Sequence, residues 1–238
     1  MIFNLLQADT LQGAAADALT QPAAQPVEMS ESLFSMFKMG GALMWVLLAL
    51  SILAIYIIGK KWWMLRQASK IDHNFMNDIR DYVTAGKFKS AVTLCRKYDN
   101  PVARMIETGI HRIGRPMGDI QSAIENIGNV EVARLEKGLP ILASIAGGAP
   151  MIGFLGTVIG MVQAFFNMSK AGNNIDITLL SGGIYTAMIT TVGGLIVGII
   201  AYFGYNYLTS KVSDLVYKME SSTLEFIDIV LNEPGEEE

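Results

Sequence analysis

The sequence predicts an all-α membrane protein with three transmembrane helices, the second and third long and extending into the cytoplasm, and a helical cytoplasmic domain. Hydrophobic residues make up 51% of the 238 residues and charged residues only 17%, whereas a soluble domain has about a quarter charged residues. Charged residues are absent from three stretches, 39–59, 138–169 and 177–210. Each stretch reaches the length of about 20 residues that a helix needs to cross a bilayer.

The placement of basic residues predicts how these helices are oriented. Residues 60–137 contain fourteen Lys or Arg and nine Asp or Glu, a net charge of +5, while the rest of the chain contains four basic and thirteen acidic residues. A basic cluster of Lys60, Lys61 and Arg66 directly follows the first stretch. Because cytoplasmic loops are enriched in Lys and Arg, we expect the N-terminus outside and both residues 60–137 and the C-terminus in the cytoplasm.

The chain therefore divides into seven segments. We expect a flexible external tail (1–38), transmembrane helix 1 (39–59), a cytoplasmic helical region (60–137), transmembrane helix 2 (138–169), an external hairpin (170–176), transmembrane helix 3 (177–210), and a cytoplasmic C-terminal helix with an acidic tail (211–238). The external tail is rich in Ala, Gln, Thr and Pro, a composition typical of flexible segments.

Apolar residues at helical spacing predict the helices outside the membrane. Such stripes begin with Phe75, Ile79 and Val83, resume after Pro101 and continue from Ile120 to Leu135. We expect this last helix to continue into transmembrane helix 2, because only Gly138 and Pro140 interrupt it. After the third stretch, Leu208, Val212, Leu215, Met219 and Phe226 follow a near-heptad pattern that predicts one continuous helix.

Small residues line one face of each of the two longer transmembrane helices. Spacings of three, four and seven positions place residues on one side of a helix. The helix 2 set is Gly153, Gly156, Thr157, Gly160 and Ala164, and the helix 3 set is Ala187, Thr191, Gly194, Gly198 and Ala201, with Thr186 and Thr190 on the adjoining stripe. We expect the glycines to pack helices together, because small residues let backbones approach closely in lipid. Pro150 is predicted to kink helix 2, and a hinge for gating is the alternative.

The threonines of these faces allow two interpretations. Each hydroxyl either bonds a carbonyl of its own helix within a packing face, or lines a pore. Three hydroxyls within six residues, at Thr186, Thr190 and Thr191, together with Thr157, favour a proton pathway. The faces are also broader than one contact between two helices requires, which predicts an oligomer or a further helix.

A proton pathway in this chain would lack a titrating group. Ionisable residues inside membranes mark proton pathways, and the three stretches contain no charged residue. Hydroxyls can relay a proton, but at neutral pH they do not hold the charge that drives a cycle. We therefore expect the carboxylate to come from another polypeptide, with protons as the coupling ion and no cofactor.

Composition and motifs argue against other classes of function. The net charge of −4 argues against nucleic-acid binding. No nucleophile–base pair or phosphate-binding loop indicates an enzyme. His73 and His111 have no acidic or cysteine neighbours at ligand spacing, so no metal site is expected, and Cys95 is predicted to be a small buried residue. Trp45, Trp62 and Trp63 fit anchoring in membrane lipid at the interface.

Two segments resemble a known family. LPILASIAGGAPMIGFLGTVIGM, Leu139 to Met161, closely resembles the second membrane helix of the ExbB/TolQ/MotA proton-channel family, and GIYTAMITTVGGLIVGIIAYFGYN, Gly183 to Asn206, resembles its third. The resemblance covers roughly residues 40–225. Three spans with an external N-terminus are similar to ExbB or TolQ proteins rather than to MotA proteins, which have four, and the whole pattern is most similar to ExbB proteins.

The resemblance implies a homopentamer in the bacterial inner (cytoplasmic) membrane, with a periplasmic N-terminus. It also implies a single-span, ExbD-like partner whose aspartate takes up and releases protons in the central lumen, and a TonB-like protein that carries the work to outer-membrane transporters. Thr157 and Thr191 match the pore threonines of the family's second and third helices. Many ExbB proteins have a glutamate where this chain has Thr186, so that glutamate's role does not transfer.

Two alternatives stay open at this point. The same motor could serve a different load, such as TolQ-like envelope maintenance or gliding, or the chain could be a passive scaffold that anchors cytoplasmic partners through residues 60–137. The charged residues at the cytoplasmic entrance of helix 2 are interpreted as a solvated helix face rather than a proton exit. They are Glu131, Arg134, Glu136 and Lys137.

Overall fold

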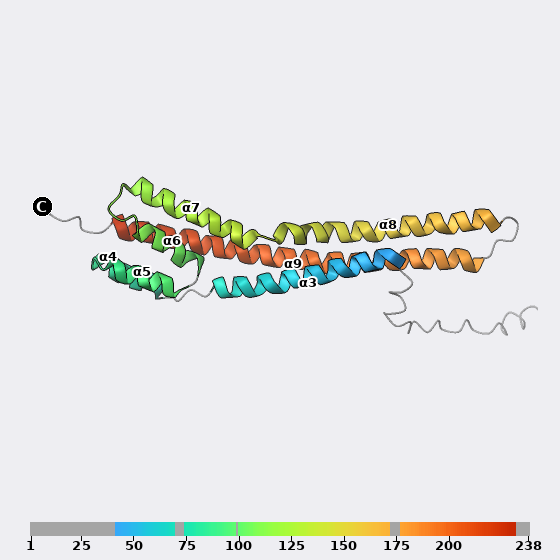
Figure 1. The fold of residues 1–238 in the computed structure, drawn as a ribbon, viewed down its shortest axis with the longest axis horizontal. Coiled ribbons are helices and arrows are strands. Elements are labelled where there is room, and N and C mark those ends of the chain that lie inside the picture. Colours follow the sequence, from blue (N-terminus) through green and yellow to red (C-terminus); the bar gives the residue numbers. More distant parts are fainter. Residues whose placement is uncertain (1–40, 70–73, 99, 172–176, 232–238) are drawn as a thin grey trace, which may run out of the picture. The chain divides into compact units, whose positions relative to one another are not determined.

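The computed structural model describes residues 41–69, 74–98, 100–171 and 177–231, which belong to one compact unit (Figure 1). Its helices are α3 (Gly41–Ala68), α4 (Phe75–Thr84), α5 (Phe88–Lys97), α6 (Pro101–Ile110), α7 (Met117–Glu136), α8 (Leu139–Ala171) and α9 (Ile177–Leu231). This part of the chain contains no strand, which confirms the all-α prediction. The expected external tail, most of the hairpin at 170–176 and the acidic end of the chain lie outside the described residues.

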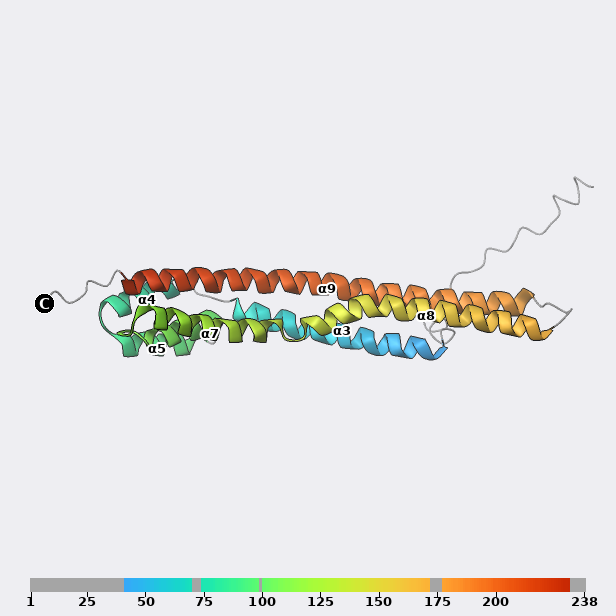
Figure 2. The same ribbon diagram turned by 90° about the horizontal axis from the view of Figure 1, so that it is seen from above.

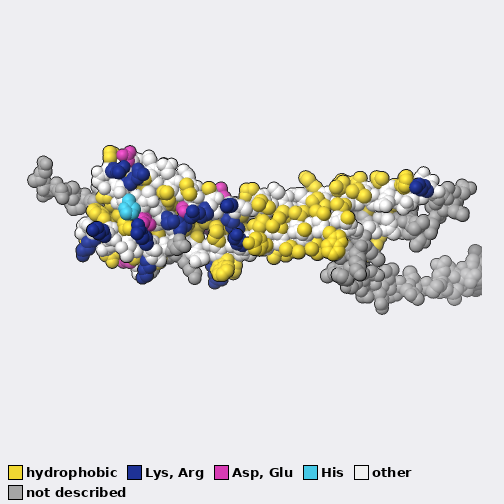
Figure 3. All heavy atoms as spheres, in the orientation of Figure 1, with side chains coloured by type: hydrophobic (Ala, Val, Ile, Leu, Met, Phe, Trp, Pro, Cys, Tyr) yellow, Lys and Arg dark blue, Asp and Glu magenta, His cyan; other side chains and the backbone are white. Residues whose placement is uncertain are grey.

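Within the described residues, three helices are long and apolar enough to cross a membrane, and their apolar parts lie in α3, α8 and α9. Figures 1 and 2 show α8 beside α9 and α3 beside α9. Hydrophobic side chains cover the surface of these helices, whereas most of the charged side chains in Figure 3 gather over α4–α7. The chain is therefore an all-α membrane protein, as the composition predicted.

α3 packs on α9 through a helix face whose buried residues follow a seven-residue repeat. Its buried residues are Met44, Leu47, Ala54, Lys61, Leu65 and Ala68. Near the start of α3, the Sδ atom of Met44 is 3.1 Å from the Cβ position of Gly193, and further along Ile58 contacts Gly204. Since both contacts advance in the same direction along the chain, α3 and α9 run parallel, and α9 extends beyond α3 at both ends.

α9 is one uninterrupted helix of 55 residues. At 1.5 Å per residue it is about 80 Å long, well beyond a hydrocarbon core of roughly 30 Å. The predicted near-heptad stripe is buried throughout, with Leu208, Val212, Leu215, Met219 and Phe226 all at most 3% exposed. Here the stripe contacts α4, α6 and α7, so the predicted continuation of this helix beyond the membrane is confirmed.

The prediction that the helix before the membrane continues into the second span is wrong. α7 ends at Glu136 and α8 begins at Leu139. Between them Gly138 has a φ of +95°, a left-handed conformation that glycine adopts without the steric cost of a Cβ. The glycine therefore separates two helices rather than kinking one, and it lets α7 and α8 take independent directions.

The start of α6 is set by local sequence signals. The carboxamide of Asn100 accepts a hydrogen bond of 2.7 Å from the backbone N–H of Ala103, and Pro101 follows at the first helical position. Both are favoured at helix N-termini, so α6 begins where the sequence predicted. At its other end the Cβ position of Gly109 is 2.5 Å from the Phe226 ring, which brings α6 into close contact with α9.

Cys95 in α5 is 2% exposed, and burial, reinforced by the nearby Glu107 carboxylate, raises the pKa of its thiol to about 12. Because the thiolate is the reactive form, we expect Cys95 to react with a maleimide roughly a hundredfold or more slowly in the folded protein than after denaturation. The mass increase from labelling the only cysteine measures both rates, and equal rates would contradict the prediction.

The raised pKa of the Cys95 thiol also predicts that folding stability falls as the pH rises from about 9 toward 12, since the thiol of the unfolded chain deprotonates first.

Candidate functional site

The small-residue faces of α8 and α9 pack against each other within one chain. A Cβ built on Gly194 would lie 2.6 Å from the carbonyl oxygen of Ala149 and 2.9 Å from the Cα of Gly153. Further along, a Cβ on Gly160 would lie 2.7 Å from the Cβ of Ala187. Only glycine permits such close backbone contact, which in a membrane favours helix association through dispersion. We call this contact the α8–α9 seam.

Pro150 lies inside α8 and takes part in the seam. The proline has no N–H and leaves the carbonyl of Ala146 without its helical hydrogen bond. The Cβ position of Gly198 on α9 is 2.6 Å from Cγ of Pro150 and 3.2 Å from this carbonyl oxygen. The glycine therefore makes room both for the proline ring and for the carbonyl that the proline leaves unpaired, and α8 stays helical through this point.

The threonine hydroxyls of the seam have defined partners. Thr191 Oγ1 donates across the seam to the carbonyl of Gly153 at 3.0 Å. Thr190, 3% exposed, donates to the carbonyl of Ala187 at 2.7 Å. Thr157 donates to Phe154 within its own helix at 2.6 Å. Each hydroxyl donates its one hydrogen to a carbonyl, so each hydroxyl oxygen can still accept a further hydrogen bond.

Thr157 and Thr191 lie at the same edge of the seam. Residues seven positions apart fall within about 20° of each other on a helix. Thr157 is seven positions after Pro150, and Thr191 is seven positions before Gly198. Because Pro150 contacts Gly198, the two threonines project toward the same side, and both are half-buried.

Thr186 lies at the opposite edge. It is seven positions before Gly193, whose Cβ position contacts Met44 and Leu47 of α3. It is also five positions before Thr191, about 140° around the helix. The four threonines predicted as one pathway are therefore divided: Thr157 and Thr191 at one edge, Thr190 within the seam and Thr186 on the α3 side.

The seam contains no Asp, Glu, Lys, Arg or His between Leu139 and Ser169 or between Ser181 and Ser210. Among the described residues, no group of three or more His, Cys, Asp or Glu side chains could hold a metal ion. The chemistry that the seam itself offers is hydrogen bonding by hydroxyls and by the carbonyl groups beside glycine and proline.

At the charged entrance to α8, Arg134, Glu136 and Lys137 are exposed, as the predicted solvated face requires, but Glu131 is buried. The side chain of Glu131 is 5% exposed, and its carboxylate accepts from Arg104 at 3.0 and 2.7 Å and from Arg134 at 3.0 Å. The solvated-face interpretation is wrong for Glu131, because two guanidinium groups compensate its buried charge.

Lys61 is a residue whose role the sequence did not reveal. It is 8% exposed, and its Nζ donates to the carbonyls of Leu135 at 2.9 Å and Arg134 at 3.2 Å. These carbonyls belong to the C-terminal turn of α7, where a cation interacts favourably with unpaired acceptors and with the helix dipole. Lys61 thus ties α3 to the end of α7, directly before the break that leads into α8. A lysine pair after an apolar stretch predicted only an orienting charge.

These features define a three-span, all-α membrane protein whose two long helices pack through glycines and carry hydroxyls but no ionisable group. A model of the MotA/TolQ/ExbB proton channel family matches residues 97–221, which include all of α8 and the membrane part of α9. The chain belongs to the MotA/TolQ/ExbB proton channel family, a family of proton channels and not of enzymes.

Individual relatives agree with this membership. The chain is 30% identical over 190 residues to a putative biopolymer transport protein, an ExbB homolog of Methanothermobacter thermautotrophicus, covering 79% of this chain and 67% of the relative. It is 35% identical over 88 residues to the biopolymer transport protein ExbB of Neisseria gonorrhoeae, covering 37% and 40% of the two chains. It is 38% identical over 85 residues to the Tol-Pal system protein TolQ of Haemophilus influenzae, covering 36% and 37%.

Proposed function

We propose that the chain is the pore-forming stator subunit of a proton-motive-force-driven motor of the ExbB type. It would act as a homopentamer in the bacterial inner membrane, with the N-terminus in the periplasm and the C-terminus in the cytoplasm. The similarity to ExbB proteins and the basic residues 60–137 support this arrangement. One observation carries the proposal: the α8–α9 seam has the hydroxyls of Thr157 and Thr191 along one edge and contains no ionisable side chain.

The titrating group belongs to a partner in this proposal, a single-span ExbD-like protein with a membrane aspartate. When that carboxyl is protonated it is a hydrogen-bond donor, and the lone pairs of Thr157 and Thr191 are suitable acceptors. When it is ionised it needs donors, and the same hydroxyls can turn from their carbonyls to supply them. The Thr157–Thr191 edge would therefore contact both states of the carboxyl, with protons as the coupling ion and no cofactor.

The energy available per proton is modest. One elementary charge that crosses 100 mV releases about 2.3 kcal/mol, comparable with the exchange of one or two charge-assisted hydrogen bonds. Contacts of this strength are suited to stepping, because a much stronger bond between carboxylate and wall would hold the partner in place. Neutral hydroxyls satisfy this requirement, whereas a lysine or arginine in the wall would trap the carboxylate.

The load is proposed to be a TonB-like protein that energises outer-membrane transport, because several relatives carry the name biopolymer transport protein. The TolQ relative favours a second candidate, the same motor acting in envelope maintenance. The ExbB protein of Neisseria gonorrhoeae and the TolQ protein of Haemophilus influenzae each match little more than a third of this chain. The Thr157–Thr191 edge would serve either function in the same way. Co-purification of the native complex with a TonB-like rather than a Pal-linked partner distinguishes the two.

Reconstitution tests the proposal. The full chain is placed in vesicles alone, or with a co-expressed one-span partner that contains a membrane aspartate, and a valinomycin-induced potential drives proton entry into a pH-sensitive dye. We expect vesicles with the chain alone to remain proton-tight and vesicles with both chains to conduct. A partner with Asp→Asn should abolish the flux.

Rapid proton-selective flux through the chain alone would overturn the assignment of the titrating group to a partner. If neither preparation conducts, although both proteins co-purify, the passive-scaffold alternative is favoured and the motor proposal fails.

A further inference from the structure

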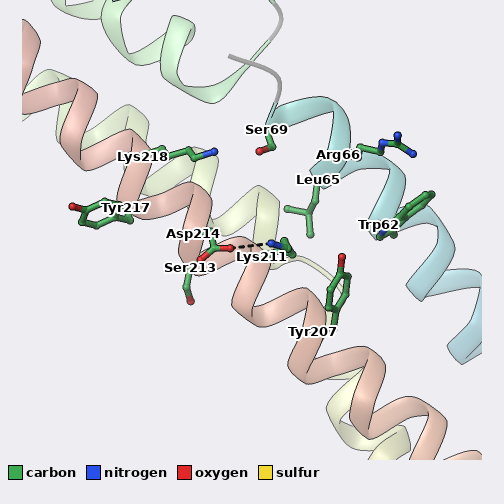
Figure 4. Close-up of a pocket in the computed structure, with 10 residues that line it drawn as sticks. All are labelled: Trp62, Leu65, Arg66, Ser69, Tyr207, Lys211, Ser213, Asp214, Tyr217 and Lys218. Carbon is green, nitrogen blue, oxygen red and sulfur yellow. Dashed lines mark hydrogen bonds and ion pairs between the residues drawn. The ribbon is translucent and has the colours of Figure 1, made fainter. Parts of the chain in front are cut away.

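A groove of about 830 Å³ lies between α3 and α9, at the end of α3 that follows the first apolar stretch (Figure 4). Trp62 and Arg66 of α3 and Ser69, which directly follows α3, line one side. Tyr207, Lys211 and Lys218 of α9 line the other. In Figure 4 the Lys218 side chain extends from α9 toward Ser69, directly after the end of α3. None of the seam threonines lines this groove, and it plays no part in the proposed proton pathway.

The groove has an excess of positive charge. Its lining contains Arg66, Lys211 and Lys218 and one carboxylate, Asp214. That carboxylate pairs with Lys211 at 3.1 Å. Arg66 lies over the Trp62 ring, with its guanidinium carbon 5.3 Å from the ring centroid, and no carboxylate of the described residues pairs with Arg66 or Lys218. Two cations are thus available to an external anion.

The α3 side and the α9 side of the groove have the same order of residue types at the same sequence spacing. On α3, Ile55, Trp62 and Arg66 are separated by seven and four positions, and on α9 Ile200, Tyr207 and Lys211 are separated identically. These spacings place each set on one helix face. Because α3 and α9 run parallel, with Met44 against Gly193 and Ile58 against Gly204, the two stripes lie side by side at matching levels.

Both stripes therefore change from aliphatic to aromatic to cationic at the same depth. The four uncharged side chains are exposed, with Ile55 at 58%, Trp62 at 45%, Ile200 at 44% and Tyr207 at 51%. A phospholipid changes in the same order, from acyl chain through glycerol backbone to phosphate, and aromatic side chains favour the level between. Basic residues between membrane helices at this level attract anionic headgroups.

We propose that the α3–α9 groove binds one anionic phospholipid of the leaflet that lies at the Ala68 end of α3. Its phosphate lies among Arg66, Lys211 and Lys218, the hydroxyls of Ser69 and Ser213 are within the same lining, and its acyl chains follow Ile55 and Ile200. The lipid would bridge the end of α3 and the part of α9 from Tyr207 to Lys218, next to Trp62. Trp62 directly follows Lys61, the residue that ties α3 to α7. The inference holds whether or not the proposed proton mechanism is correct.

Native mass spectrometry of the full-length oligomer in mild detergent tests this inference with three probes: phosphatidylglycerol, phosphatidylcholine and inorganic phosphate. The wild-type protein should retain phosphatidylglycerol in preference to phosphatidylcholine. The double variant Arg66→Gln, Lys218→Gln should bind phosphatidylglycerol about 25-fold more weakly, because each basic residue near a membrane surface contributes about fivefold. Its oligomer mass in the same spectrum shows whether it still assembles.

Lys170→Gln is the matched control, since Lys170 ends the apolar part of α8 at the opposite end of the seam and lies over Phe166, 4.5 Å from its ring centroid. It should change phosphatidylglycerol affinity less than twofold. Equal retention of both lipids by the wild type, or unchanged binding by the double variant, would overturn the inference. Displacement of the lipid by millimolar inorganic phosphate would reduce the groove to a simple anion site and would overturn it as well.

A crosslinker at position 69 gives an independent readout that needs no loss of charge. It should label phospholipid in native membranes. Labelling of a neighbouring copy of the chain instead would show that another protein surface occupies the groove, contrary to the inference.

Discussion

Replacing Thr191 or Thr157 with valine is expected to lower proton flux through the reconstituted complex about tenfold or more. Valine preserves the shape of threonine but removes the hydroxyl, and a hydrogen bond to a charged group contributes about 1.5–3 kcal/mol, of which 1.36 kcal/mol corresponds to a factor of ten in rate. The Thr191 variant also loses the 3.0 Å bond to Gly153, at a cost of about 1 kcal/mol. The oligomer should therefore still assemble.

Thr186→Val is the matched control for this prediction. It removes the same hydroxyl from the same helix, but at the opposite edge of the seam, on the side where Gly193 meets α3. Flux measured in vesicles with the partner present should stay near the wild-type value. Equal losses in all three variants would show that the partner contacts both edges, and full activity of the Thr157 and Thr191 variants would remove these residues from the pathway.

Gly194→Ala is expected to have the largest effect on assembly. The added Cβ would lie 2.6 Å from the Ala149 carbonyl oxygen and 2.9 Å from the Cα of Gly153, and backbone atoms cannot turn aside as a flexible side chain can. Overpacking of this kind costs about 1–3 kcal/mol. We expect the thermal unfolding midpoint to fall and the oligomer to dissociate at lower detergent concentrations, measured by scanning fluorescence and by mass.

Gly182→Ala provides the comparison on the same helix. A Cβ at this position has no heavy atom within 4 Å apart from its own helix, and alanine exceeds glycine in helix propensity by about 1 kcal/mol. This variant should be as stable as the wild type or slightly more so. If the Gly194 variant were equally stable, the close contact at the seam would not be needed for folding.

The membrane-spanning helices followed directly from the sequence, because burial in lipid depends on the composition of a continuous segment. The stretch 177–210 and the stripe from Leu208 to Phe226 together predicted a helix that leaves the bilayer, and α9 is such a helix. Caps were equally local, and Pro101 predicted the start of α6. The break at Gly138 was missed because a glycine between helices and a glycine within a helix have the same sequence signature. The carbonyls at the end of α7 are bound by Lys61, which lies 73 and 74 positions away from Arg134 and Leu135 in the chain.

The candidate site was also predicted only in part from the sequence. Spacing identified the small residues and the four threonines, but a helix face broader than one contact does not reveal which part of it a neighbouring helix covers. Contacts between Pro150 and Gly198 and between Met44 and Gly193 were needed to separate Thr191 from Thr186. The buried pairing of Glu131 with Arg104 was hidden for the same reason, since the two residues lie on different helices.

By itself the sequence determined the number of spans, the absence of a charge within them and the residues that allow close helix packing, because these depend on composition and on the period of a single helix. The tertiary structure alone decided which hydroxyls share an edge and which carbonyls Lys61 binds. It also decided that the matching stripes of α3 and α9 lie at the same level on either side of a basic groove. Each of these depends on the rotation and register of one helix against another. Register is set by contacts between residues far apart in the chain, and no local pattern encodes it.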